Sequence, residues 1–196
     1  DALEKGGFEV ITTKVAQNQL ENYINEHNID GILVRSATQV RQELIDACPS
    51  IKLIGRGGVG MDNIDVEYAE EQGLHVINTP AASSSSVAEL VFAHLFGLAR
   101  FLHSSNREMP LEGDSRFKEL KKAYSQGIEL KGKTIGIIGF GKIGQEVAKI
   151  GLGLGMNVIA TDEIITSAPI IVEFFNGQKI TINIDTITKD ELLKES

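Results

Sequence analysis

The sequence predicts an α/β protein with two doubly wound parallel-sheet domains, one flavodoxin-like and one Rossmann-like, both incomplete in this chain. Two observations predict this fold class. Along the first half of the chain, β-rich runs of four or five residues alternate with amphipathic helical patterns. In the second half, a glycine-rich turn stands between an apolar run that ends at Ile138 and a helical pattern, as in a βαβ unit.

The composition is that of a soluble globular protein. Of the 196 residues, 42% are hydrophobic and 23% are charged, and no apolar run is long enough to span a membrane. The start of the chain has no signal-peptide pattern and no Met, so we expect residues before Asp1 and a cytoplasmic protein. A net charge of −8 without a basic stripe argues against a nucleic-acid partner. The single cysteine, Cys48, excludes an intrachain disulfide framework and is expected to be buried.

The first domain is expected to span residues 1–86 and to bind substrate. Its β-rich runs predict one parallel sheet, with the intervening helices as right-handed crossovers. Thr38 is expected to cap the second of these helices. The expected strands are 8–12, 31–34, 51–54 and 74–77, and the expected helices are 17–27, 39–47 and 67–72.

The second domain, residues 87–196, is expected to begin with a long helix. Ser86 and Glu89 have capping-box spacing ahead of apolar residues that continue to Leu102, so we expect a largely buried helix. Residues 104–131 are polar and predict a solvated linker with a short helix. The alternative for this long segment is an arm that contacts a second subunit.

The rest of the second domain resembles the first half of a Rossmann domain with an insertion. The run ending at Ile138 and residues 157–161 predict two buried strands joined by a helix. Two β-rich runs around Asn176-Gly177 predict a hairpin insertion at about 168–185. Thr188 and Glu191 have capping-box spacing and predict one more helix.

Three glycines in the turn after Ile138 predict a dinucleotide site. Gly139, Gly141 and Gly144 have the spacing G-x-G-x-x-G, which provides a tight turn, close approach of a pyrophosphate and close packing of helix on strand. Asp162 ends the next strand, where a carboxylate accepts hydrogen bonds from a ribose. A structural glycine-rich turn is the alternative, but strand, helix, second strand and acid all favour the dinucleotide.

Two further loops predict an anion site at the end of the first sheet. Gly55-Arg56-Gly57-Gly58-Val59-Gly60 follows one expected strand, and converging backbone N–H groups in such a loop bind anions. Arg35-Ser36-Ala37-Thr38 follows another and offers a guanidinium and two hydroxyls for a carboxylate or phosphate. The alternatives are a tight βα turn and a plain surface arginine.

Neither the histidines nor the serine cluster has the surroundings expected of a catalytic group or a metal ligand. The four histidines have no acid at the spacing of a catalytic triad or a metal site, so structural roles are expected for them. The Ser83–Ser86 cluster lacks a general base, and capping or anion contact at a helix N-terminus explains it. The histidines are His27, His75, His94 and His103.

These motifs together resemble those of the D-isomer-specific 2-hydroxyacid dehydrogenases, and within them the branch that acts on D-3-phosphoglycerate. The resemblance runs from about residue 31 to 162. Besides the two anion loops and the glycine turn, it includes Met61-Asp62-Asn63-Ile64-Asp65, Asn78-Thr79-Pro80 and Val87-Ala88-Glu89-Leu90. The order in which the motifs occur makes the resemblance more specific than any one of them.

The resemblance implies roles for named residues. NAD would contact the glycine turn, Asp162 and, near the nicotinamide, Val59. The substrate carboxylate would lie against the backbone of residues 57–60. The phosphate of a phosphohydroxy acid would face arginine and hydroxyl side chains. Thus the implied cofactor residues are Gly139, Gly141, Lys142, Ile143, Gly144, Asp162 and Val59, and the implied substrate residues are Arg35, Ser36, Thr38, Arg56, Gly57, Gly58 and Val59.

Two departures from the family pattern stand out. Val59 replaces the usual threonine or alanine, and Ser83 or Ala82 replaces the usual asparagine before the long helix. In the family, a catalytic arginine, glutamate and histidine lie beyond the point that matches Ser196, so none is expected in this chain and the chain alone is expected to be inactive.

The resemblance therefore implies an NAD-dependent oxidoreductase. The expected reaction is oxidation of 3-phosphoglycerate to 3-phosphohydroxypyruvate in serine biosynthesis, by a homodimer or larger homo-oligomer. The composition and the residue spacing add the expectation that it binds no membrane and no metal. A glyoxylate, hydroxypyruvate or D-lactate reductase of the same fold is one alternative. A non-catalytic NAD-sensing module is another.

Overall fold

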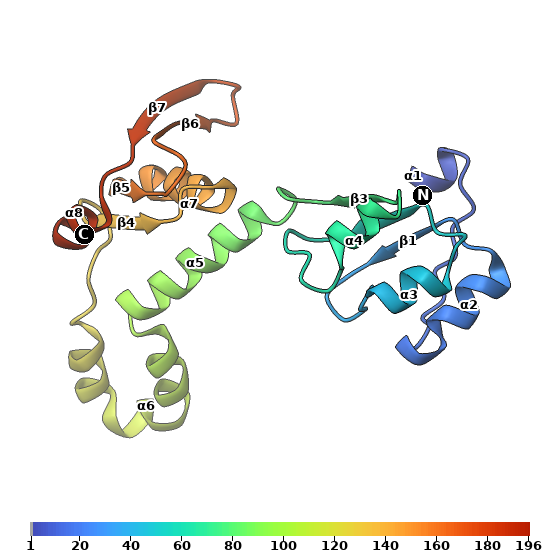
Figure 1. Cartoon of the computed structure of the whole chain (residues 1–196). Coiled ribbons are helices and arrows are strands. Elements are labelled where there is room, and N and C mark those ends of the chain that lie inside the picture. Colours follow the sequence, from blue (N-terminus) through green and yellow to red (C-terminus); the bar gives the residue numbers. More distant parts are fainter. Residues whose placement is uncertain (1) are drawn as a thin grey trace. The chain divides into compact units, whose positions relative to one another are not determined.

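The computed structural model describes residues 2–196, which form two compact units that divide between Pro80 and Ala81 (Figure 1). This division falls earlier than the expected boundary between residues 86 and 87. Helix α5 (Ser84–Ala99) packs against α7 (Lys142–Gly153), so its first turn belongs to the second unit. The roles expected of the two domains, substrate binding and NAD binding, remain predictions.

The first unit contains a parallel sheet in the order β1-β2-β3. Its strands are β1 (Gly31–Val34), β2 (Leu53–Arg56) and β3 (His75–Asn78). In the register, Val34 lies opposite Arg56, and Arg56 lies opposite Asn78. The carboxyl ends of all three strands therefore meet at one edge of the sheet, where the two predicted anion loops begin.

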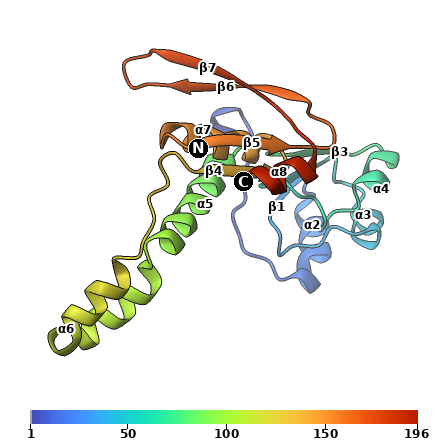
Figure 2. The ribbon, with the colours of Figure 1, turned by 90° about the vertical axis from the view of Figure 1, so that its left-hand side faces the viewer.

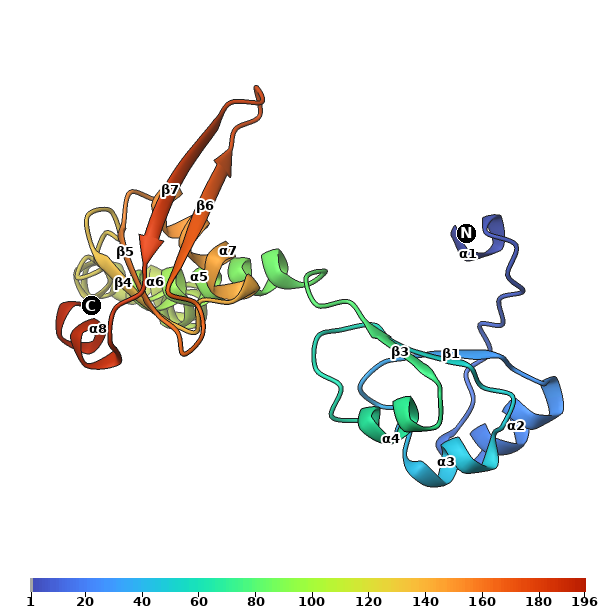
Figure 3. The same ribbon diagram turned by 45° about the horizontal axis from the view of Figure 1, so that its top comes forward.

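Three helices cover one face of this sheet, namely α2 (Leu20–His27), α3 (Gln42–Ala47) and α4 (Val66–Glu71) (Figure 3). Between them and the sheet lie buried apolar side chains such as Ile24, Val40 and Ile54, together with Cys48 as predicted. Two short elements, α1 (Ala2–Lys5) and a 3-10 turn η1 (Gln17–Gln19), precede α2.

Two predictions for this unit were wrong. Residues 8–12 form no strand, because no neighbouring strand pairs with them, and Phe8 is exposed. The helix expected from residue 39 begins at Gln42, and Thr38 does not cap it. Instead, the carboxylate of Asp65 accepts a hydrogen bond from the backbone N–H of Gln42 (3.1 Å), so the cap comes from a distant part of the chain.

The second unit is built on two parallel strands, β4 (Thr134–Ile138) and β5 (Asn157–Thr161). Helix α7 covers one face, and α8 (Lys189–Glu195) packs on both strands from the other. The tight fit is visible at Gly136, where an added Cβ would lie 2.8 Å from Leu192 Cδ2. This half of the fold and its strand bounds agree with the sequence prediction.

The expected hairpin is present and consists of β6 (Ser167–Glu173) and β7 (Lys179–Asp185), paired antiparallel (Figures 1 and 2). Its base packs into the core of the unit through Ala168, Ile170 and Ile184. After the hairpin, the capping box at the start of α8 is confirmed, with Thr188 and Glu191 each bonding the other's backbone N–H.

Helix α5 differs from its prediction. It begins at Ser84 rather than after Ser86, and no side chain caps it. Much of its apolar surface is uncovered, since Leu90 is 57% exposed and Leu98 is 78% exposed. The prediction of a largely buried helix was therefore wrong for the described residues.

The predicted linker at 104–131 is also wrong, because most of it forms α6 (Leu102–Tyr124). Arg116 has non-helical backbone angles, and the two halves of α6 fold back side by side (Figures 1 and 2). The rings of Phe101 and Tyr124, at the two ends of this segment, lie 6.3 Å apart.

Taken singly, no helix within residues 2–196 has the length and apolar composition needed to cross a membrane. Helices α5 and α6 meet that test only as a pair bent by 55°.

Candidate functional site

At each of the three glycines after β4, a different physical reason accounts for the lack of a side chain. Gly139 has φ of 94°, a conformation that favours glycine. An added Cβ at Gly144 would lie 2.2 Å from the carbonyl oxygen of Gly139, so α7 can approach the turn only without a side chain there. Gly141 has an ordinary φ of −70°, and an added Cβ would meet nothing within 4 Å. The fold itself therefore does not require glycine at residue 141, whereas a ligand lying against this backbone would.

The N-terminus of α7 lies beside this open backbone. Gly141 is its N-cap residue, and no side chain caps the helix. The first N–H groups of a helix lack internal acceptors and carry the positive end of the helix dipole, so they bind phosphate groups well. Lys142 and Ile143, which open the helix, are both exposed. The predicted cofactor residues of the turn are thus brought together in one surface.

Asp162 directly follows β5 and contacts the backbone of the glycine turn. Its carboxylate accepts hydrogen bonds from the backbone N–H groups of Phe140 (2.6 Å), Ile164 (2.9 Å) and Ile165 (3.0 Å). The bonds from Ile165, Ile164 and Phe140, in that order of effect, lower the pKa of the carboxyl below its ordinary value. A carboxylate has about four acceptor positions, so one remains for a ribose hydroxyl.

In the first unit, the glycine loop after β2 is held by both neighbouring strands. The N–H of Gly57 donates to the carbonyl oxygen of Val34 at the end of β1 (2.9 Å). On the other side, the side chain of Asn78 donates to the carbonyl oxygen of Val59 (2.8 Å). The loop is therefore fixed before any ligand arrives. Sequence reasoning missed the role of Asn78, although its position at the end of a predicted strand was a signal.

Not all N–H groups of this loop are available to an anion. Those of Gly57 and Gly58 donate to backbone carbonyls within the unit. Those of Val59 and Gly60 have no acceptor among the described residues, and both residues are exposed. The predicted anion loop thus offers two adjacent donors at Val59 and Gly60, while Gly57 and Gly58 contribute by having no side chain.

Two arginines flank the same loop. An added Cβ at Gly57 would lie 3.8 Å from Cγ of Arg35, and one at Gly58 would lie 1.7 Å from Nη1 of Arg56. The Arg35 side chain is exposed and has no hydrogen-bond or ion-pair partner in residues 2–196. The structure therefore places both predicted arginines, with Ser36 and Thr38 in the loop after β1, at one edge of the sheet.

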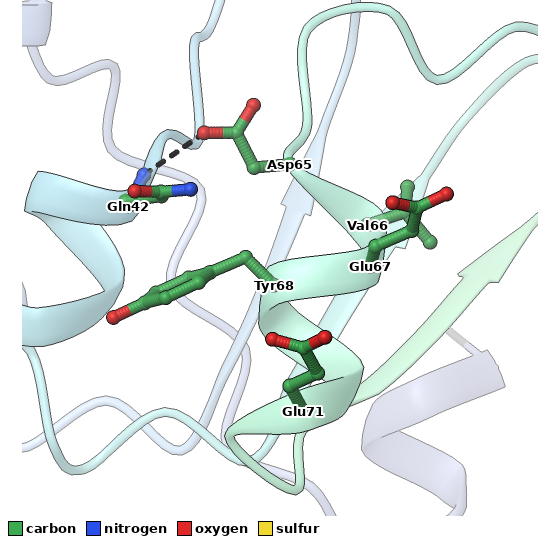
Figure 4. A pocket seen from close by; sticks show the side chains of 6 residues that line it. All are labelled: Gln42, Asp65, Val66, Glu67, Tyr68 and Glu71. Atoms are coloured by element: carbon green, nitrogen blue, oxygen red, sulfur yellow. Dashed lines mark hydrogen bonds between the residues drawn. The ribbon is translucent and has the colours of Figure 1, made fainter.

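A pocket of about 450 Å³ lies elsewhere on the first unit, beside α3 and α4 (Figure 4). The carboxylates of Asp65, Glu67 and Glu71 line it, together with Gln42 and Tyr68. It contains none of the predicted substrate residues, and its negative charge is unsuited to an anionic substrate.

The family described as D-isomer specific 2-hydroxyacid dehydrogenase, catalytic domain, matches residues 1–194. The chain belongs to this family. Among its relatives, a hydroxypyruvate reductase from Thermotoga maritima is 40% identical over 188 residues, which are 96% of this chain and 56% of that protein. A D-3-phosphoglycerate dehydrogenase from Methanocaldococcus jannaschii is 41% identical over 160 residues, 82% of this chain and 29% of the relative.

A solved member of the family has the same fold. The NAD+-bound 3-phosphoglycerate dehydrogenase of Entamoeba histolytica is 30% identical, with a TM-score of 0.67, over 98% of this chain and 52% of that chain. The predicted family and the α/β fold class are therefore confirmed, and NAD is the cofactor bound in this neighbour. The chain spans about half the length of these proteins, or less.

Proposed function

We propose that the protein is an NAD-dependent dehydrogenase that oxidises 3-phosphoglycerate to 3-phosphohydroxypyruvate, as serine biosynthesis requires. One observation carries the choice of substrate. Two arginines and two free backbone N–H groups, those of Val59 and Gly60, surround one glycine loop, which suits a substrate with two anionic groups. A phosphorylated hydroxy acid has a carboxylate at one end and a phosphate at the other.

The second unit fits NAD. Gly141 leaves room for a pyrophosphate at the N-terminus of α7, and Asp162 has one acceptor position left for a ribose hydroxyl. The carboxylate of Asp162, followed by Glu163, disfavours the 2′-phosphate of NADP by charge repulsion. When bound, NAD accepts the hydride that leaves the hydroxyl-bearing carbon.

The first unit orients the substrate. Its carboxylate would accept hydrogen bonds from Val59 and Gly60, and its phosphate would pair with Arg35 and Arg56, with Ser36 and Thr38 as additional donors. Held at both ends, the substrate presents its central carbon in one orientation, which is how binding contributes to the rate. We assign proton transfer to no residue of this chain.

Reduction of hydroxypyruvate is the second candidate. It is supported by the Thermotoga maritima relative, whose alignment covers 96% of this chain, compared with 82% for the Methanocaldococcus jannaschii dehydrogenase. In either case, we propose that the protein is cytoplasmic and forms a homodimer or larger homo-oligomer. The oligomer is supported by large apolar side chains that α5 and α6 leave exposed, such as Leu98 and Leu111.

The substitution Arg35→Ala separates these candidates in the full-length protein. If Arg35 pairs with phosphate, kcat/KM should fall at least about 100-fold for 3-phosphoglycerate, because a charge-assisted bidentate pair contributes about 3 kcal/mol. For D-glycerate, which lacks the phosphate, it should change by less than about threefold. Equal losses for both substrates would remove the phosphate role and favour the unphosphorylated substrate.

A further inference from the structure

A buried asparagine connects the two anion loops of the first unit. Asn63 is only 5% exposed. Its Nδ2 donates to two backbone carbonyl oxygens of the loop after β1, those of Arg35 (3.1 Å) and Thr38 (2.6 Å). Its Oδ1 accepts a hydrogen bond at 3.4 Å from Nε of Arg56, the last residue of β2 and part of the second anion loop, Gly55–Gly60. One side-chain amide thus bonds to both loops.

The backbone around Asn63 is fixed independently of this side chain. The N–H of Val40 donates to the carbonyl oxygen of Asn63 (2.8 Å), and the N–H of Asp65 donates to the carbonyl oxygen of Val40 (3.0 Å). Next to them, the guanidinium of Arg41 pairs with the carboxylate of Asp65 (2.8 Å) and donates to the carbonyl oxygen of Asp62 (2.7 Å). The amide therefore projects from a rigid segment and can hold the more exposed loops.

We propose that Asn63 is a positioning residue for the substrate, which holds the backbone of Arg35 and the guanidinium of Arg56 in the arrangement that receives the two anionic groups. This inference rests on the proposed function. An amide suits the task because it combines two N–H donors with an acceptor oxygen, whereas a carboxylate only accepts and an aliphatic side chain does neither. Arginine side chains have many rotamers, so fixing them beforehand lowers the entropy lost on binding.

The isosteric substitution Asn63→Asp tests the inference in the full-length enzyme. A carboxylate keeps the contact with Arg56 but turns both contacts with the loop after β1 from attraction into repulsion. We expect KM for 3-phosphoglycerate to rise at least about tenfold, which is 1.4 kcal/mol of binding. The affinity for NAD should stay within about twofold, because all the implied cofactor residues except Val59 lie in the other unit.

Two further variants control for folding. Asn25→Asp removes the same kind of bond, from Nδ2 of Asn25 to the carbonyl oxygen of Ala47 (2.9 Å), at a site on α2 away from the loops, and should leave KM unchanged. Asn63→Ser is the variant to use if Asn63→Asp does not fold. Its short hydroxyl cannot reach both loops, so KM should again rise at least about fivefold.

The outcomes distinguish this inference from the proposed function. The inference alone is overturned if the wild type is active and the folded Asn63 variants have the same KM as the wild type. A lower thermal midpoint as their only change would show that Asn63 has a structural role. A wild type that oxidises no D-2-hydroxy acid would overturn the proposed function and the inference with it.

Discussion

In the glycine turn, a single added methyl group is expected to affect either folding or cofactor binding, depending on which glycine is replaced by alanine. At Gly144, an added Cβ would lie 2.2 Å from the backbone oxygen of Gly139. Such overpacking costs about 1–3 kcal/mol, offset by up to about 1 kcal/mol because alanine is the better helix former. Because the clash is with a backbone atom, the upper end of this range applies, and Gly144→Ala should lower the free energy of unfolding by about 2 kcal/mol. Gly153→Ala, in open space on the same helix, should raise it by up to about 1 kcal/mol.

Gly141→Ala should behave differently from both. Its Cβ meets nothing in the protein, so stability should fall by less than about 1 kcal/mol, because alanine is the poorer N-cap. Its methyl group would occupy the space assigned to the pyrophosphate, and the Kd for NAD should rise at least about tenfold. Guanidinium denaturation and isothermal titration calorimetry on the full-length protein measure the two effects. Wild-type affinity for NAD in Gly141→Ala would refute the placement of the cofactor on this turn.

Three further predictions concern other residues. The folded state lowers the pKa of Asp162, so its carboxylate stabilises the fold fully above about pH 5 and progressively less as the pH falls through the lowered pKa. The difference in unfolding free energy between wild type and Asp162→Asn should therefore shrink over that pH range. A difference that stays constant with pH would contradict this role of the carboxylate. Thr188→Ala removes the capping box of α8 and should destabilise the protein by about 1 kcal/mol in a denaturation titration, whereas no loss would show that the cap is dispensable. Gly58→Ala would displace the guanidinium of Arg56, because the added Cβ would lie 1.7 Å from Nη1 of Arg56. This substitution should raise KM for 3-phosphoglycerate about tenfold. An unchanged KM would exclude Arg56 from substrate binding.

The features that could be predicted from the sequence depend on residues close together in the chain. The glycine turn, the capping box at Thr188 and the Asn176-Gly177 hairpin each lie within a few residues, and their local spacing specifies their geometry. The same is true of the strand over 157–161, where a run of apolar residues has its partner strand one helix away.

Most of the features that sequence patterns did not predict involve contacts between distant residues. Residues 8–12 have the composition of a strand, but a strand also needs a partner, and the described residues provide none. Helix α6 contains Pro110 and Gly113, which predict irregular structure, yet the chain departs from helical angles only at Arg116. The link from Asn63 to Arg35 spans 28 positions, and no local pattern indicates it.

One measurement tests the central claim most directly. The full-length protein is mixed with NAD and 3-phosphoglycerate, and NADH formation is followed by its absorbance, with D-glycerate and D-lactate in parallel. Our account predicts that kcat/KM for 3-phosphoglycerate exceeds that for D-glycerate at least about 100-fold, because only the phosphorylated acid pairs with the arginines beside the glycine loop. Equal or faster oxidation of D-glycerate would contradict the assignment of Arg35 and Arg56 to a phosphate.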